Sequence, residues 1–304
     1  MIADTKTSPH LTDRAPRDDE IDFFGLTHTG NVRKNNQDHF LICSVRRKME
    51  VHISSLPSLD RLPLGAERIA LRAMVADGVG GGPMGEEASR LAVEAVTQYV
   101  TRSIKLCTAD SAASPTDAFA HALEDAAREC HDGILRQAAD NQELAGMATT
   151  LTMWIGMWPR SYLLHVGDSR CYLLHDGELT QLSRDQTMAQ ELVDLGVLSR
   201  TDAYRSPWVN VLSSAIGGQQ TTPVVTSLSQ VWGTVGLLCS DGLTKHVSDE
   251  RIRERLLNMT SARQVSEALV QDALDNGGTD NITVVVGRTV RKDEEPDDRT
   301  DARA

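Results

Sequence analysis

Hydrophobic and polar positions along the chain follow two periods, and the changes between them divide it into elements. Near the N-terminus, runs of apolar and β-branched residues at 21–28, 37–45 and 68–76 predict three strands. The period then becomes helical, with apolar residues at Ala88, Leu91, Ala92, Ala95 and Tyr99. The first part of the body is therefore predicted to form three strands and then an amphipathic helix.

The rest of the chain repeats this alternation. A second helix is predicted to begin at Ser114, because Pro115 and Asp117 suit the first helical turn. Short β-rich runs separated by turn dipeptides come next, at 148–158, 161–166, 170–174 and 178–182. The remaining predicted elements are a helical region at 187–204, strands at 208–214, 222–228 and 236–239, helices capped by Ser248 and Ser261, and a strand at 281–290.

This order predicts an α+β fold, in which a central antiparallel β-sandwich is flanked on both faces by antiparallel helix pairs, giving four layers. Residues 21–290 contain no dividing linker and are expected to form one domain. Residues 1–20 and 291–304 are polar or charged and follow no period, which is typical of disordered segments. Residues 46–66, with two prolines and a glycine, predict an exposed loop.

Composition and charge narrow the class of partner. The 304 residues include 31 basic and 43 acidic side chains, and this net charge of −12 argues against nucleic acid or an anionic membrane as a partner. No apolar run reaches the length of a membrane span, and the N-terminus shows no signal-peptide core. Five scattered cysteines lie among apolar neighbours, which suits free thiols in a reducing compartment. We expect a cytoplasmic monomer.

Three aspartates stand at the ends of apolar runs. Asp77 and Asp241 each close a run and precede a glycine, and Asp280 comes just before the last predicted strand. Carboxylates gathered at one rim repel each other unless a cation lies between them, and all-oxygen ligands suit Mg²⁺ or Mn²⁺. Asp-Gly and Asp-Asn are also ordinary turn signals. Spacing alone leaves both interpretations open.

Other polar residues offer weaker signals. Arg33 lies alone in a polar loop that ends at Asp38. Arginine suits bidentate phosphate binding and Asp38 suits a metal-bound water, although such a loop is often only a solvated connection. Asp168 and Arg170 are expected to pair or to cap a tight turn. The sequence has no P-loop ending, no covalent-nucleophile motif and no zinc-hydrolase motif.

In chain order these motifs resemble the metal-dependent protein phosphatase family, the type 2C-like serine/threonine phosphatases, in a bacterial stand-alone form. The matching pieces are Gly30-x-Val32-Arg33-x-x-Asn36-Gln37-Asp38, Asp77-Gly78-Val79-Gly80-Gly81, Gly146-Met147-Ala148-Thr149-Thr150, Gly167-Asp168-Ser169-Arg170, Ser240-Asp241-Gly242-Leu243 and Gly278-Thr279-Asp280-Asn281-Ile282-Thr283. Because six pieces occur in the family order over about residues 22–289, the resemblance is specific.

The resemblance implies a two-metal site at one end of the sandwich. Asp77 would bridge two Mn²⁺ or Mg²⁺ ions, and the carbonyl of Gly78 would complete one coordination sphere. Asp241 and Asp280 would hold the other ion, and Asp38 would orient bound water.

The resemblance also implies how substrate is bound. Arg33 would clamp the substrate phosphate, and residues 187–217 would form a mobile flap beside the site, where substrate choice is made. Glu143 lies where bacterial relatives often have Asp, so it would help to hold a weakly bound third ion. It could equally be an exposed residue at the end of the second helix.

Three positions depart from the family pattern. Gln37 replaces the usual Glu and removes one negative charge, Gly82 stands where bacterial members often have a histidine acid, and Ala148 replaces the middle glycine of its motif. No direct ligand of the implied two-metal core is lost. We therefore expect activity.

The expected reaction is hydrolysis of phosphoserine and phosphothreonine in proteins, by a metal-bridging hydroxide that attacks phosphorus in line without a phosphoenzyme. The substrates would be targets of a serine/threonine kinase. The alternative is a catalytically weak module that keeps the phosphatase fold and acts as a protein-interaction or regulatory domain. Retention of the acidic residues favours the enzyme.

Overall fold

The computed structural model describes residues 14–48, 51, 66–80, 83–107 and 115–292, and their strands form two antiparallel sheets. The first sheet has the order β1 (Ile21–His28), β11 (Ile282–Thr289), β10 (Val235–Cys239), β7 (Arg170–His175) and β8 (Glu178–Gln181). The second has the order β2 (Asp38–Arg47), β3 (Glu67–Val79), β5 (Leu151–Met157), β6 (Arg160–Val166) and β9 (Val224–Ser229), and β4 (Ala148–Thr149) pairs with β3.

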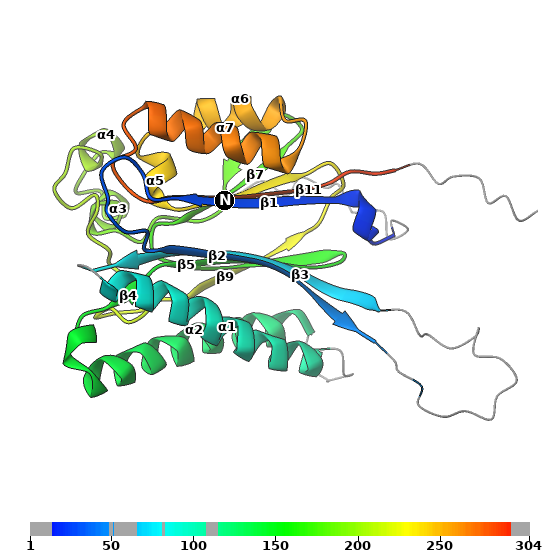
Figure 1. Cartoon of the computed structure of the whole chain (residues 1–304), viewed down its shortest axis with the longest axis horizontal. Helices are drawn as coiled ribbons and strands as arrows, with labels where there is room; N and C mark the ends of the chain where they lie inside the picture. The colour runs from blue at the N-terminus through cyan, green and yellow to red at the C-terminus, as the bar shows by residue number, and fades with distance from the viewer. Residues whose placement is uncertain (1–13, 49–50, 52–65, 81–82, 108–114, 293–304) are drawn as a thin grey trace, which may run out of the picture.

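Helices cover the outer face of each sheet (Figure 1). The second sheet is covered by α1 (Pro83–Cys107) and α2 (Pro115–Asp140), and the first by α6 (Asp249–Leu257) and α7 (Ala262–Asp275). The predicted α+β fold with two antiparallel sheets is therefore confirmed, and in this structure its layers follow the order α-β-β-α. Within the described chain, no helix is both long enough and apolar enough to cross a membrane.

Short helices lie at the two ends of the sandwich (Figure 1). The end that carries β4 also carries α3 (Met188–Asp194), α4 (Arg200–Ala203) and α5 (Asp241–Thr244). The opposite end carries the 3₁₀ helix η1 (Asp18–Glu20). The predicted caps of the last two helices are confirmed, because the Ser248 and Ser261 side chains each accept a hydrogen bond from a first-turn backbone N–H.

The apolar core is split by the sheets into three parts. Two larger parts lie between each sheet and its helices, and a smaller part between the sheets consists of Ala73, Val75, Leu163, Cys171, Leu238 and Val285. Strands such as β3 and β11 are buried on both faces. This explains why they appear in the sequence as continuous apolar runs and not as an alternation.

Two predicted elements differ in the structure. β3 does not end at Ala76 but continues to Val79, because Gly78 and Val79 pair with β4. Residues 208–214 do not form the predicted strand. Their backbone carbonyls instead bind the start of α3, where Met188 N donates to Val211 O at 2.8 Å and Ala189 N donates to Trp208 O at 3.3 Å.

Residues 14–20 were expected to be disordered, but they pack on the body. The carboxylate of Glu20 is buried and accepts hydrogen bonds from both terminal nitrogens of Arg14 at 2.6 Å. The backbone N–H of Lys292 donates to the same carboxylate at 3.0 Å, which ties the two ends of the described chain together. Predictions for 1–13, Gly82, Ser114, most of 46–66 and 293–304 lie outside the described residues.

Candidate metal centre

Four aspartates from both sheets meet at the end of the sandwich that carries α5. The register of β2 against β3 places Asp38 directly opposite Asp77. Asp241 follows β10 and Asp280 precedes β11, and these two strands are neighbours in the other sheet. The negative charges of Asp38, Asp241 and Asp280 all act on Asp77. The structure thus brings the four predicted aspartates together.

Asp38 is the most enclosed of the four. Its Oδ2 atom accepts hydrogen bonds from Ser240 Oγ and Thr283 Oγ1, each at 2.7 Å. Burial raises the pKa of Asp38 to about 6 in spite of these bonds. Its Oδ1 atom is buried and has no hydrogen-bond partner within the described chain. A buried oxygen without a partner suggests that a water or cation belongs there.

Asp77 is fixed through its backbone. Its N–H donates to Thr150 Oγ1 at 2.9 Å, and its carbonyl accepts from Thr149 Oγ1 at 2.8 Å. Burial, followed by the charges of Asp38 and Asp241, raises the pKa of Asp77 well above its usual value. The neighbours thus hold the main chain of Asp77, while its carboxyl group interacts with that of Asp241.

The contacts of Gln37 account for the presence of Gln where the family usually has Glu. Its side-chain amide donates to Gly80 O at 3.2 Å, and its backbone carbonyl accepts from Gly78 N at 3.1 Å and from Ser89 Oγ at 2.6 Å. A glutamate carboxylate could not donate to Gly80. A Cβ atom at Gly78 would lie 2.1 Å from Gly85 O, so only glycine permits this close approach.

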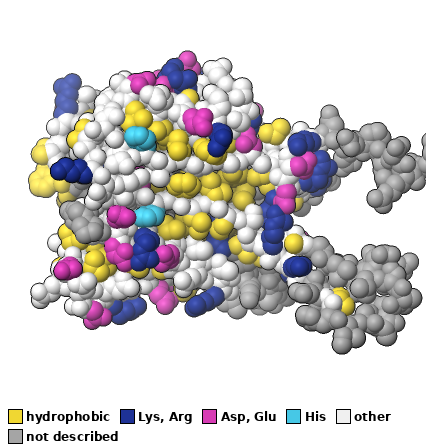
Figure 2. All heavy atoms as spheres, in the orientation of Figure 1, with side chains coloured by type: hydrophobic (Ala, Val, Ile, Leu, Met, Phe, Trp, Pro, Cys, Tyr) yellow, Lys and Arg dark blue, Asp and Glu magenta, His cyan; other side chains and the backbone are white. Residues whose placement is uncertain are grey.

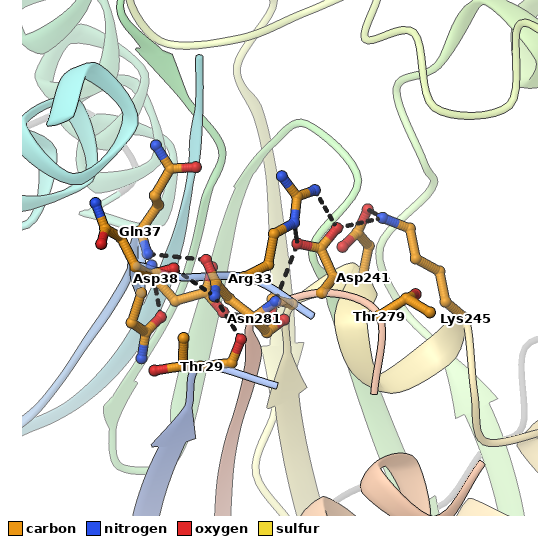
Figure 3. Close-up of polar contacts among 12 residues, drawn as sticks. Thr29, Arg33, Gln37, Asp38, Asp241, Lys245, Thr279 and Asn281 are labelled. Atoms are coloured by element: carbon orange, nitrogen blue, oxygen red, sulfur yellow. Dashed lines mark hydrogen bonds and ion pairs between the residues drawn. The ribbon is translucent and has the colours of Figure 1, made fainter. Parts of the chain in front are cut away.

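Two cationic side chains contact this pair of aspartates: Lys245 contacts both Asp241 and Asp280, and Arg33 contacts Asp280 (Figure 3). The Lys245 ammonium lies 2.5 Å from Asp241 Oδ2 and 2.9 Å from Asp280 Oδ2. Arg33 approaches from the other side, with Nε 2.8 Å from Asp280 Oδ1. Burial tends to raise the pKa of Asp280, but Lys245 and Arg33 together lower it. Burial raises the pKa of Asp241 although Lys245 opposes the shift, and its Oδ1 has no partner in the described chain.

The loop that carries Arg33 is held by Asn281. The Asn281 side-chain oxygen accepts from Gln37 N, and its amide donates to the carbonyls of Thr29 and Asn35, each at 2.9 Å. Three bonds from one side chain therefore fix both ends of the loop. This explains how Arg33, distant in sequence, lies across the aspartates.

Of the two roles expected for Asp168 and Arg170, the pairing of one with the other is wrong. Arg170 pairs with Asp185 at 2.7 Å and not with Asp168. Asp168 instead joins the carboxylate cluster, where burial and then the charge of Asp241 raise its pKa to about 8. The position of Asp168 in the sequence could have predicted this. Asp168 follows an apolar strand and a glycine, and the cluster residues Asp77 and Asp241 also stand at the ends of apolar runs. Lys245 was also missed, although it lies one helical turn after Asp241.

Two further predicted features remain predictions. Glu143 is exposed on the 3₁₀ helix η2 (Gln142–Leu144), and its described hydrogen bond is from its backbone N–H to Asn141 Oδ1 at 3.0 Å. Residues 187–217 do lie at the same end of the sandwich as the aspartates (Figure 1). Their proposed motion and role in substrate choice stay hypotheses.

The donor set fits a hard cation. Carboxylates and a backbone carbonyl are the ligands that Mn²⁺ and Mg²⁺ prefer, and Asp38 and Asp241 each have an unsatisfied buried oxygen. In the described chain, no three acidic, imidazole or thiol groups yet converge as a ready-made ligand set. Lys245 and Arg33 occupy oxygens of Asp241 and Asp280, so a metal ion at these oxygens would have to displace both cations.

Comparison with known proteins agrees with this geometry. The family model for protein phosphatase 2C matches residues 54–276. The chain is 38% identical over 234 residues to the serine/threonine protein phosphatase PstP of Mycobacterium tuberculosis, covering 77% of this chain and 42% of PstP. It is 33% identical over 215 residues to the serine/threonine phosphatase stp of Listeria monocytogenes, covering 70% of this chain and 82% of that protein. The chain thus spans less than half of the length of PstP.

Solved structures show the same fold. The crystal structure of Mycobacterium tuberculosis PstP/Ppp matches with a TM-score of 0.70 and 32% identity, over 89% of this chain and 99% of the other. The PstP catalytic domain in complex with two manganese ions matches with a TM-score of 0.66 and 31% identity, over the same shares. With the family model covering most of the chain, this protein belongs to the protein phosphatase 2C family.

Proposed function

We propose that this chain hydrolyses phosphoserine and phosphothreonine in proteins, with Mn²⁺ or Mg²⁺ as cofactor. The observation that carries the proposal is the cluster of aspartates from both sheets beneath Arg33, with unsatisfied oxygens on Asp38 and Asp241. The names of the relatives, and the two manganese ions in one PstP structure, support the same reaction class.

The metal would be held by Asp77, the Gly78 carbonyl, Asp241 and Asp280. Two bound ions would supply Lewis acidity and a nucleophilic water at neutral pH. Asp168 is a further carboxylate beside Asp241, and Glu143 remains a candidate for a weak third ion.

Asp38 would orient the water that attacks phosphorus. Ser240 and Thr283 fix one of its oxygens, so the other is left to accept a hydrogen bond from that water. The raised pKa of Asp38 shows that burial disfavours its charged form in the absence of a cation.

Two cationic side chains would bind the phosphate. Arg33 is half exposed and offers a planar fork of donors, which suits two phosphate oxygens. Lys245, released from Asp241 and Asp280 when these hold metal, would become a second cation near the phosphate. Both side chains therefore change partners during binding.

A protein substrate is favoured by the surface beside the cluster. The region of α3 and α4 exposes large apolar side chains that a small phosphate ester would not need, namely Leu195, Val197, Tyr204 and Trp208. Exposed apolar residues gathered at one place commonly mark a surface for a protein partner. The partner would be a phosphoprotein produced by a serine/threonine kinase.

The test is hydrolysis of para-nitrophenyl phosphate and of a phosphothreonine peptide by the purified chain, with Mn²⁺ and then with excess chelator. We expect metal-dependent hydrolysis of both substrates. Absence of turnover for both would favour the alternative, an interaction module with a phosphatase fold. Turnover of the small ester without the peptide would contradict the proposed substrate class.

A further inference from the structure

Gln186 lies at the base of the flap region (residues 187–217), in the connection between β8 and α3. The residue is buried although its side chain is polar, so each of its polar groups needs a hydrogen-bond partner. The metal ligands and the phosphate-binding residues proposed above do not include it. The partners of Gln186 show which parts of the chain it holds together.

On one side, Gln186 binds the residue that precedes Asp168. Gln186 N donates to Gly167 O at 2.8 Å, and Gly167 N donates to the side-chain oxygen of Gln186 at 2.9 Å. This pair of bonds fixes both polar groups of the Gly167 main chain. Asp168 follows directly, and its carboxyl group belongs to the aspartate cluster.

Thr150 confines the same turn. A Cβ atom at Gly167 would lie 2.6 Å from Thr150 Cγ2, and the φ angle of Gly167 is +105°, so the position requires glycine. Thr150 Oγ1 lies 2.7 Å from Ser169 Oγ and also accepts a hydrogen bond from Asp77 N at 2.9 Å. The turn is therefore packed against the same residue that holds Asp77.

On its other side, Gln186 binds the segment in which the flap region returns to the sandwich. Ser213 N donates to Gln186 O, and Gln186 Nε2 donates to Thr222 O, each at 2.9 Å. The next residue, Thr187, caps α3 and forms a β-bridge with Leu212. Gln186 therefore meets the flap region both where it leaves the sandwich and where it returns.

The flap region carries the exposed apolar surface that favours a protein substrate. Tyr204 and Trp208 are among its exposed side chains, and hydrophobic side chains are visible at the left edge of Figure 2. A substrate that contacts this surface would act on a segment whose base is bonded to Gly167. A displacement of either segment changes the partners that Gln186 can keep.

We propose that Gln186 is a positioning residue that couples the flap region to the metal centre. Through Gly167 it sets where the Asp168 carboxylate lies, and through Ser213 and Thr222 it makes that position depend on the flap region. Such a coupling is reciprocal, so metal binding also restricts the motion of the flap region. The inference rests on the proposed metal centre.

Calorimetric titration with Mn²⁺ tests the positioning role. Gln186→Met keeps the length of the side chain but removes its donor and its acceptor, and we expect the Mn²⁺ affinity to fall at least about tenfold. Gln186→His offers one ring nitrogen to accept and the other to donate, so it should recover part of the loss. The matched control is Gln271→Met on α7, where the exposed amide binds only Asp275 of the same helix. This control should bind Mn²⁺ as the parent does.

Asp168→Asn separates positioning from a general structural role. If Gln186 acts through Asp168, Gln186→Met should cost little further Mn²⁺ affinity in the Asp168→Asn background. A residue that only supports the fold would instead cause the same loss in both backgrounds.

Hydrogen exchange followed by mass spectrometry tests the coupling without changing Gln186. Mn²⁺ should slow exchange several-fold in the flap region of the parent, where Met188 N and Ser213 N donate hydrogen bonds. Asp168→Asn should remove this slowing. This measurement decides if circular dichroism shows that Gln186→Met fails to fold.

Three outcomes would overturn the proposal. These are unchanged Mn²⁺ affinity in a folded Gln186→Met variant, additive losses from Gln186→Met and Asp168→Asn, and exchange in the flap region of the parent that does not respond to Mn²⁺. Absence of Mn²⁺ binding to the parent would contradict the proposed metal centre, and this inference with it.

Discussion

The two ends of the β-sandwich are built from the same strands but have opposite chemistry. At one end, β3, β10 and β11 lead to Asp77, Asp241 and Asp280. At the other end, β10 and β11 contribute Gly236 and Gly287 to an apolar cavity. A carboxylate cluster needs a cation and so costs stability without one, whereas a cavity only lacks contacts.

This difference shows which parts of the fold contribute most to its stability. The two larger apolar cores lie outside the sheets, under the helices, and the core between the sheets is smaller. Changes at the aspartate end should affect activity, and changes at the cavity end should affect mainly stability.

The largest effect is expected at the aspartate end. Asp241→Asn replaces an anionic ligand with a neutral amide. Loss of a residue that merely supports a metal ligand lowers activity by up to about 100-fold, and kcat/KM should fall by more than this in Asp241→Asn. The matched control is Asp176→Asn, in an exposed Asp-Gly turn, which should keep full activity. Near-normal turnover of Asp241→Asn at saturating Mn²⁺ would contradict the two-metal assignment.

Arg33→Ala should weaken substrate binding by about 10- to 100-fold, because hydrogen bonds to a charged group contribute about 1.5–3 kcal/mol. Arg33→Lys keeps the charge but not the fork and should recover only part of the loss. Steady-state kinetics beside a Mn²⁺ titration separates the two roles. A collapse of metal affinity with unchanged KM would make Arg33 a structural residue.

Metal removal should make stability depend on pH. The pKa of Asp38 is raised to about 6 and that of Asp168 to about 8, against about 3.9 in an unfolded chain. Between those values the metal-free folded chain binds more protons than the unfolded chain, so its free energy of unfolding falls as the pH rises. Mn²⁺ favours the charged carboxylates and should remove this fall.

The measurement is the melting temperature with Mn²⁺ and with chelator across this pH range. We expect the gap between the two to widen as the pH rises from about 5 to about 8. A gap of constant size would mean that the carboxylate cluster does not carry the metal.

Lys245→Met should tighten Mn²⁺ binding several-fold, because the ammonium that contacts Asp241 and Asp280 competes with the ion for the same oxygens. Calorimetric titration of Mn²⁺ measures this directly. Lys34→Met, in the exposed loop next to Arg33, controls for the general loss of a positive charge. Unchanged Mn²⁺ affinity in Lys245→Met would show that the lysine does not compete.

The smallest effect is expected at the cavity end. Gly236→Val should raise the free energy of unfolding by about 0.5–1 kcal/mol, because glycine is unfavourable in a strand and the added side chain enters open space. Hydrolysis of para-nitrophenyl phosphate should not change. A loss of activity with retained fold would show that the two ends of the sandwich are coupled.

Local patterns in the sequence predicted most of the elements. Alternation and helical periods identified nearly all strands and long helices, and the side chains of Ser248 and Ser261 marked two helix starts, because these signals depend on near neighbours. Local patterns failed at the positions where long-range contacts determine the structure. β3 extends because β4 pairs with it, and residues 208–214 bind α3 instead of a sheet.

The acidic residues themselves were also visible in the sequence, at the ends of apolar runs. Only the tertiary structure decided which of them meet. The register of β2 and β3 places Asp38 opposite Asp77, and the folding of α5 turns Lys245 toward Asp241. Asp168 joins the same cluster, and its sequence neighbour Arg170 pairs with Asp185 instead. A carboxylate's neighbours in space, and not in sequence, set its charge and therefore its chemistry.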